Sequence, residues 1–297
     1  MVASPDAVAL REEVGAFALP RDFVRAAGPD TVSFLQGQLS QDVAALDVGG
    51  SAFSLLLQPQ GKMEALLRLT RVAEDEVVLD TDAGWGQAVA ERLDRFLLRT
   101  RCGLEPLDWR CVAVRGPAAA GLPGPPPGVL RVAPETPGVP GFDLVGPGAE
   151  VPEGVPMVAP EAYEALRIEA GVPRMGAEID PSTIPAATGV VDRTVSFTKG
   201  CYTGQELVAR IDSRGSRVPR QLRGVVVATN VLPPVGAAVV VGGREAGTLT
   251  SVGESLARRA PVGLAYVRRD VEPPAEAVLR WDGGEAPARV ETLPLVS

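Results

Sequence analysis

An eight-residue stretch, Lys199 to Glu206 (KGCYTGQE), holds the residue types best suited to chemistry in this chain. Cys201 follows Lys199 by two positions, and Thr203 and Glu206 have the spacing of a helix capping box. This spacing predicts that Cys201 lies just outside the positive end of a helix. Helix N–H groups and the Lys199 ammonium would both favour a thiolate. We therefore predict a reactive Cys201 assisted by Lys199, with a small packed side chain as the alternative.

Composition excludes several other chemistries. The 297 residues include no histidine, which rules out Ser-His-Asp and Cys-His catalysis and every zinc site that needs histidine. Cys102, Cys111 and Cys201 are widely spaced and form neither a CxxC pair nor a disulfide framework, so we expect no metal site and reduced thiols in a cytoplasmic protein. The net charge of −8 argues against direct binding of nucleic acid through a basic surface.

The sequence also predicts no membrane segment. Residues 1–20 carry acidic side chains and lack the basic-then-apolar pattern of a signal peptide. The most apolar stretch, 225–241, is interrupted by Asn230, Pro233 and Pro234.

Apolar periodicity predicts mixed helices and strands in the first part of the chain. A helix is expected after Pro29-Asp30, and another is expected with Asp82 as its cap and Trp85 on its inner face. The strand pattern covers 52–57, 65–70, 76–80 and 111–114, with a loop at 58–62.

The rest of the chain predicts two further units. Residues 117–160 are rich in Pro and Gly; short strand patterns at 129–132 and 142–145 favour a folded segment over a linker. Pro160 and Gly171 suit the start and end of a helix. From residue 221, short valine-rich runs separated by turns predict a small β-barrel or sandwich. We expect domains at 1–115, 116–218 and 219–297, the first of them discontinuous in sequence.

Several motifs together resemble one family. KGCYTGQE, Gly28-Pro29-Asp30 with the following 34–43 block, Leu166 to Gly171, and Pro185 are similar to blocks of the YgfZ-type folate-binding proteins, relatives of the glycine cleavage aminomethyltransferase (T protein). The resemblance covers most of residues 28–225. It implies an α+β fold in which two intertwined α+β domains surround a central pocket, followed by a C-terminal β-barrel.

The resemblance also implies a ligand and a role. The ligand would be tetrahydrofolate or a one-carbon derivative. The role would be that of an accessory protein for assembly or maintenance of iron–sulfur enzymes, affecting tRNA modification indirectly. Its partners would then be folate and iron–sulfur enzymes or their assembly proteins.

Individual residues carry over from the family pattern. Asp143 falls where relatives place a carboxylate that binds the pterin, and Arg167 falls on a helix whose arginine faces the folate. On the residues alone, Asp143 would be a solvated acid at a strand edge, and Arg167 could equally pair with Glu164 or Glu169. Glu64, Tyr202 and Gln205 are the remaining candidate folate contacts.

The chain departs from the aminomethyltransferases at residues 60–65. Those enzymes carry a pair of aspartates there, whereas this chain has Glu64 and Ala65, and they lack the cysteine found here at 201. The departure favours an accessory protein; a folate-dependent aminomethyl- or methyl-transferase using Glu64 is the alternative. A local arginine cluster is either a solvated face or a landing site for an acidic tail or partner; it comprises Arg210, Arg214, Arg217, Arg220 and Arg223.

Overall fold

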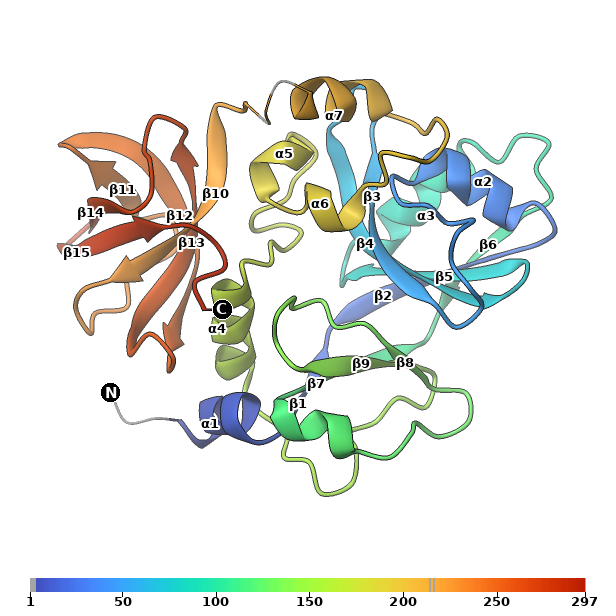
Figure 1. Cartoon of the computed structure of the whole chain (residues 1–297), viewed down its shortest axis with the longest axis horizontal. Coiled ribbons are helices and arrows are strands. Elements are labelled where there is room, and N and C mark those ends of the chain that lie inside the picture. The colour runs from blue at the N-terminus through green and yellow to red at the C-terminus, as the bar shows by residue number, and fades with distance from the viewer. Residues whose placement is uncertain (1–3, 214, 216, 297) are drawn as a thin grey trace.

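The computed structural model describes residues 4–213, 215 and 217–296, and its strands form three separate sheets. In Figure 1 a closed barrel lies on one side and two open sheets lie on the other, with helix α4 (Pro160–Ala170) between them. This arrangement confirms the expected α+β class with a C-terminal β-barrel.

A five-stranded antiparallel sheet forms the largest core. Its order is β3-β4-β5-β2-β6, and helices α2 (Thr31–Gln38) and α3 (Gly86–Asp94) pack against it. Most of β4 is buried: Met63, Ala65, Leu67 and Leu69 line one face, and Leu66, Arg68 and Thr70 are buried on the other. The strands are β2 (Arg21–Ala27), β3 (Ser51–Leu57), β4 (Met63–Ala73), β5 (Glu76–Asp82) and β6 (Gly103–Leu107).

The second sheet explains why the first two domains are intertwined. Strand β1 (Gly15–Leu19) pairs with β7, whereas β2, which begins after the single residue Pro20, pairs with β5 and β6 of the other sheet. The chain therefore contributes one strand to each sheet before either is complete. The order is β1-β7-β9-β8, with β7 (Arg110–Arg115), β8 (Leu130–Val132) and β9 (Gly141–Gly146).

The last sheet closes on itself as a six-stranded barrel in the order β10-β13-β12-β11-β14-β15. Its interior is filled by small and branched side chains such as Val225, Leu279 and Val290, which have 0% exposure. Closure leaves no unpaired sheet edge. The strands are β10 (Arg220–Val227), β11 (Ala238–Val241), β12 (Arg244–Ser255), β13 (Ala260–Arg268), β14 (Ala275–Trp281) and β15 (Gly284–Glu291).

The remaining helices are short. They are α1 (Pro5–Glu12), the 3-10 turn η1 (Pro117–Gly121), α5 (Pro185–Thr188), α6 (Val191–Thr194) and α7 (Gln205–Asp212). Within the described residues, no helix is long and apolar enough to cross a bilayer.

Helix boundaries separate the predictions that succeed from those that fail. Helix α4 begins at Pro160 and ends at a left-handed Gly171, as predicted. Helix α3 begins at Gly86 behind Trp85, so the prediction that Asp82 caps it is wrong.

The predicted capping box at Thr203 and Glu206 is also wrong. Helix α7 begins behind Gly204, whose φ is 83°, and no side chain caps it. The Thr203 N–H donates instead to the Gly37 carbonyl at 3.1 Å. A Cβ on Gly204 would lie 2.6 Å from the Gln58 carbonyl oxygen, so only glycine fits this close, left-handed turn.

Candidate functional site

A cavity of about 840 Å³ opens beside α4, bordered by α1, β1 and the barrel strand β12. Phe17 of β1 and Tyr163 of α4 form part of its wall as a stacked aromatic pair, with ring centroids 4.8 Å apart and planes 18° apart. Leu19, Met175 and Val252 extend the apolar lining. A large apolar cavity with a few polar groups is typical of a small-molecule or cofactor site.

Charged side chains also line the cavity: Asp82, Glu161, Glu164, Glu254 and Arg174. Glu161 and Glu254 are exposed, whereas Glu164 is half-buried. Burial raises the pKa of Glu164, but the guanidinium groups of Arg167 and Arg174 outweigh it and hold that pKa below its ordinary value. Glu164 therefore stays ionised at neutral pH.

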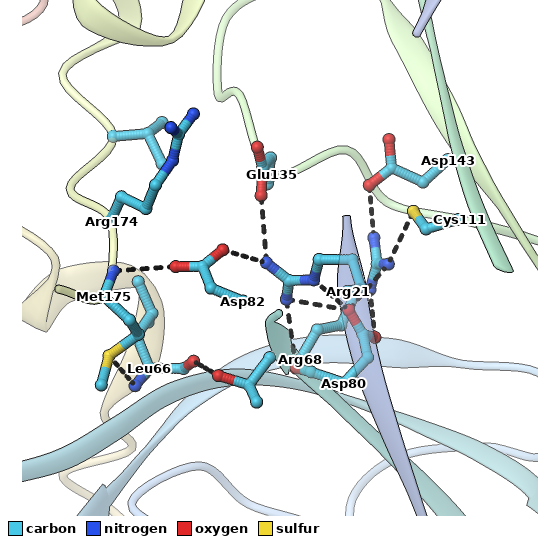
Figure 2. Close-up of polar contacts among 12 residues, drawn as sticks. Arg21, Leu66, Arg68, Asp80, Asp82, Cys111, Glu135, Asp143, Arg174 and Met175 are labelled. Atoms are coloured by element: carbon cyan, nitrogen blue, oxygen red, sulfur yellow. Dashed lines mark hydrogen bonds and ion pairs between the residues drawn. The ribbon is translucent and has the colours of Figure 1, made fainter. Parts of the chain in front are cut away.

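Behind the cavity lies a buried ion-pair network (Figure 2). Arg21 links three carboxylates, with nitrogen–oxygen distances of 2.8 Å to Asp80, 3.1 Å to Asp82 and 3.2 Å to Glu135. Arg68 pairs with the same Asp80 at 2.9 Å. Because these groups satisfy one another, the network provides a rigid charged backing for the cavity wall.

Asp143 belongs to this network and does not line the cavity. It lies on β9 with 1% exposure, and its two carboxylate oxygens are 2.6 Å from Arg68 and 2.7 Å from Arg115. Burial raises the pKa of Asp143, but Arg115 and Arg68 outweigh burial, so the pKa is lowered overall. Its pterin-binding role stays a prediction, and the alternative of a solvated acid is wrong because the side chain is buried.

Tyr163 joins the aromatic wall to the network. Its hydroxyl donates to Glu135 Oε1 at 3.0 Å and accepts from Arg115 Nη2 at 3.1 Å. Burial raises the pKa of Tyr163 well above its ordinary value, so the phenol stays neutral. The ring that borders the cavity is thus fixed from behind by two charged groups.

Arg167 is 1% exposed on α4 and makes internal contacts. It pairs with Glu164 at 2.6 Å and Glu178 at 3.2 Å, and donates to Ser251 Oγ at 2.6 Å. The predicted salt bridge with Glu164 is confirmed, whereas the alternative with Glu169 is wrong, since Glu169 pairs with Arg11. A direct folate contact by Arg167 stays a prediction; the structure places the arginine behind Glu164.

Lys199 has a structural role that the sequence did not show. Its ammonium donates to three backbone carbonyls, those of Gln36 at 2.7 Å, Leu39 at 2.7 Å and Gln41 at 2.9 Å. It thereby satisfies carbonyls at the C-terminal end of α2. Burial lowers the pKa of Lys199 to about 8. The three hydrogen bonds engage all three N–H donors of the ammonium with backbone carbonyls.

Cys201 is exposed in the same loop, whereas Cys111 is buried and Cys102 is half-buried. The loop is fastened to the 36–41 segment on both sides of the thiol, by Lys199 before it and by the Thr203 N–H after it. These contacts fix the backbone on both sides of the exposed cysteine. Its catalytic role with Lys199 stays a prediction.

The remaining predicted folate contacts lie apart from the described lining of the cavity. Tyr202 is 7% exposed in the main core, and its N–H donates to Gln205 Oε1 at 3.3 Å. Glu64 is half-buried on β4 and its charge acts on Arg92, partly offsetting the lowering of the Arg92 pKa by burial. Their roles in folate binding stay predictions.

The arginine cluster does not converge on the cavity either. Arg210, Arg217 and Arg220 are exposed, Arg223 is half-buried beside Gln221, and Arg214 lies outside the described residues. Over the part of the chain that the structure describes, no three Cys, Asp or Glu side chains group as metal ligands would.

Sequence reasoning missed the network residues Arg21, Arg68, Arg115 and Asp80 and the cavity residues Phe17, Asp82 and Tyr163. One available signal was an arginine or aspartate inside an otherwise apolar strand, as at Arg68 in β4 and Asp80 in β5. Charged residues at such positions are buried and need partners.

Comparisons with known proteins agree with this architecture. The sequence model of the glycine cleavage T-protein C-terminal barrel domain matches residues 220–296. A solved structure, glycine cleavage system aminomethyltransferase T from Bartonella henselae, superimposes with a TM-score of 0.85 at 27% identity, covering 98% of this chain and 88% of that one.

Similar sequences fall into two named groups. An aminomethyltransferase from Streptomyces avermitilis is 27% identical over 97% of this chain and 87% of its own length. The tRNA-modifying protein YgfZ from Pectobacterium atrosepticum is 29% identical over 70% of this chain and 69% of its own length. An uncharacterized protein from Haemophilus influenzae is 27% identical over 64% of this chain, which spans only 65% of that relative. These similarities in sequence and fold support a YgfZ/GcvT-like family for this chain.

Proposed function

We propose that the protein binds tetrahydrofolate or a one-carbon derivative in the cavity beside α4. The observation that carries the proposal is the combination of a cavity of about 840 Å³ with the stacked Phe17–Tyr163 pair and carboxylates in its lining. A flat pterin offers a face for apolar contact and amino groups that donate to carboxylates. Similarity to this family adds support.

We further propose that the protein acts as an accessory factor for iron–sulfur enzymes and influences tRNA modification through them. The exposed, backbone-anchored thiol of Cys201 would be the contact group. Iron–sulfur clusters usually take about four protein ligands. Cys201 would therefore act with a partner protein rather than hold a cluster alone.

Binding is tested by titrating tetrahydrofolate into the purified protein in a calorimeter under reducing conditions. Ala83 lines the cavity, so Ala83→Trp should fill it and abolish the binding heat. Ala44→Trp is the matched control, because Ala44 is exposed and outside the cavity lining. Absence of heat with the parent protein would refute the folate proposal.

The accessory role is tested separately. Cys201→Ser should bind tetrahydrofolate like the parent yet fail to restore iron–sulfur enzyme activity in cells deleted for the gene. Cys102→Ser is the control, since Cys102 lies outside the motif and is half-buried. Full restoration by Cys201→Ser would refute the role assigned to the thiol.

A further inference from the structure

We propose that Asp82 is the carboxylate that receives the amino-pyrimidine edge of the pterin, an inference that rests on the proposed folate binding. Asp82 ends β5 and contributes directly to the cavity lining. Its side chain retains 19% exposure even though it lies at the front of the buried network. Asp82 combines access from the cavity with free acceptor positions on a fixed side chain.

Asp143 is buried away from the cavity, and Glu164 has both carboxylate oxygens occupied by guanidinium groups. The two oxygens of Asp143 face Arg68 and Arg115, and the residue is 1% exposed and absent from the described cavity lining. Glu164 accepts three hydrogen bonds, at 2.6 and 3.0 Å from Arg167 and 2.6 Å from Arg174. A pterin would have to enter the buried core to reach Asp143, and it would have to displace an arginine from Glu164.

Asp82 is accessible from the cavity, unlike Asp143, and accepts fewer hydrogen bonds than Glu164. Its Oδ1 accepts from Arg21 Nη1 at 3.1 Å, and its Oδ2 accepts from the Met175 N–H at 2.8 Å (Figure 2). A carboxylate has about four acceptor positions, so about two remain for a ligand. Those two contacts also fix the rotamer, which is the condition for recognising a planar edge.

The other lining carboxylates lack this fixed placement. Glu161 and Glu254 are exposed, and neither forms an ion pair with any residue the structure describes. Long, solvated side chains must lose rotamer freedom to bind a ligand. Asp82 has already lost that freedom to Arg21 and Met175.

The experiment is a thermodynamic cycle in which one change is made in the protein and one in the ligand. Titrations compare parent and Asp82→Asn, each with tetrahydrofolate and with its 2-desamino analogue, which lacks the exocyclic amino donor. The parent should bind the analogue about 10- to 100-fold more weakly, the range expected for loss of a hydrogen bond to a charged acceptor. Asp82→Asn should lose a similar factor for tetrahydrofolate and discriminate the two ligands by less than about threefold.

The controls separate binding from folding. Asparagine keeps an oxygen for the Met175 N–H, and a thermal melt of Asp82→Asn establishes that the variant is folded. If it is not, Asp82→Glu keeps the charge and shifts it by one methylene, and it should also lose discrimination. Glu153→Gln, at an exposed carboxylate outside the described cavity lining, should discriminate the ligands as the parent does.

The outcomes distinguish the two proposals. A parent that binds no tetrahydrofolate overturns the proposed function, and this assignment with it. A parent that binds, together with a folded Asp82 variant that still discriminates the analogue by more than about tenfold, overturns the assignment of Asp82 alone.

Discussion

Removing the charge of Asp143 should strongly destabilise the protein, whatever its effect on ligand binding. Asp143→Asn keeps the shape of the side chain but removes the carboxylate that lies 2.6 Å from Arg68 and 2.7 Å from Arg115. Arg68 keeps Asp80, whereas Arg115, at 0% exposure, loses the only carboxylate that pairs with it among the described residues. A buried guanidinium without its partner carries an uncompensated desolvation penalty.

The expected loss is about 3–5 kcal/mol, the usual range for breaking a buried ion pair by removing one partner. Total unfolding free energies are about 5–15 kcal/mol, so the change should be plain in a urea titration. Asp270→Asn is the matched control. Its carboxylate also pairs with an arginine, Arg268 at 2.7 Å, but it is 64% exposed, and its urea midpoint should not move.

The pH dependence gives a second readout with a defined sign. The pKa of Asp143 is lowered in the folded protein, because Arg115 and Arg68 outweigh burial. Its contribution is therefore present above the unfolded pKa of about 4 and is lost as pH falls through the folded value. The difference in unfolding free energy between the parent and Asp143→Asn should become smaller in acid. A difference in unfolding free energy below about 1 kcal/mol at neutral pH would refute the reasoning.

Three further predictions follow from the motif and its neighbours. Gly204→Ala should lower the unfolding free energy by about 2 kcal/mol or more in a urea titration, because alanine would adopt a left-handed conformation with its Cβ 2.6 Å from the Gln58 oxygen. Gly200→Ala is the control and should have little effect, since the space around its Cβ is open. Equal losses of unfolding free energy in the two variants would contradict the packing argument. Iodoacetamide mapping should label Cys201 before Cys111, since Cys201 is exposed and burial raises the pKa of Cys111; the reverse order would exclude a reactive Cys201. Glycine-cleavage reconstitution should show no efficient aminomethyltransferase turnover, because Ala65 interrupts the acidic pair; a rate matching a genuine T protein would contradict this.

Local patterns predicted most elements of the fold because each signal is read from neighbouring residues. Pro160 and Gly171 predicted α4, and alternating apolar residues predicted β3, β4 and the barrel strands. The strands β1 and β2 were not predicted. The polar residues Arg21, Asp22 and Arg25 obscure the apolar pattern of β2, and their partners are far away in sequence.

The candidate site was harder to predict because its chemistry depends on long-range pairing. Asp143 carried the right residue type for a pterin, but the sequence could not show that Arg68 and Arg115, 75 and 28 positions away, would engage both oxygens. Asp82 was predicted to be a helix cap, and its actual partners are Arg21 and the Met175 N–H. Which aspartate is accessible and still has free acceptor positions can therefore be recognised only once the fold is known.

The same distinction applies to the KGCYTGQE motif. Sequence spacing joined Lys199 and Cys201 as one chemical unit, yet the structure gives the ammonium three backbone carbonyls of the 36–41 segment. That anchor, together with the Thr203 N–H on the far side, fixes the backbone on both sides of an exposed thiol. The motif length then has a physical reason. Lys199, two positions before Cys201, and Thr203, two positions after it, both bind backbone carbonyls at the end of α2, and Gly204 turns the chain into α7. Lys199 would serve the thiol by holding the loop in place, and its substitution should disturb the position of Cys201 as well as any charge near it.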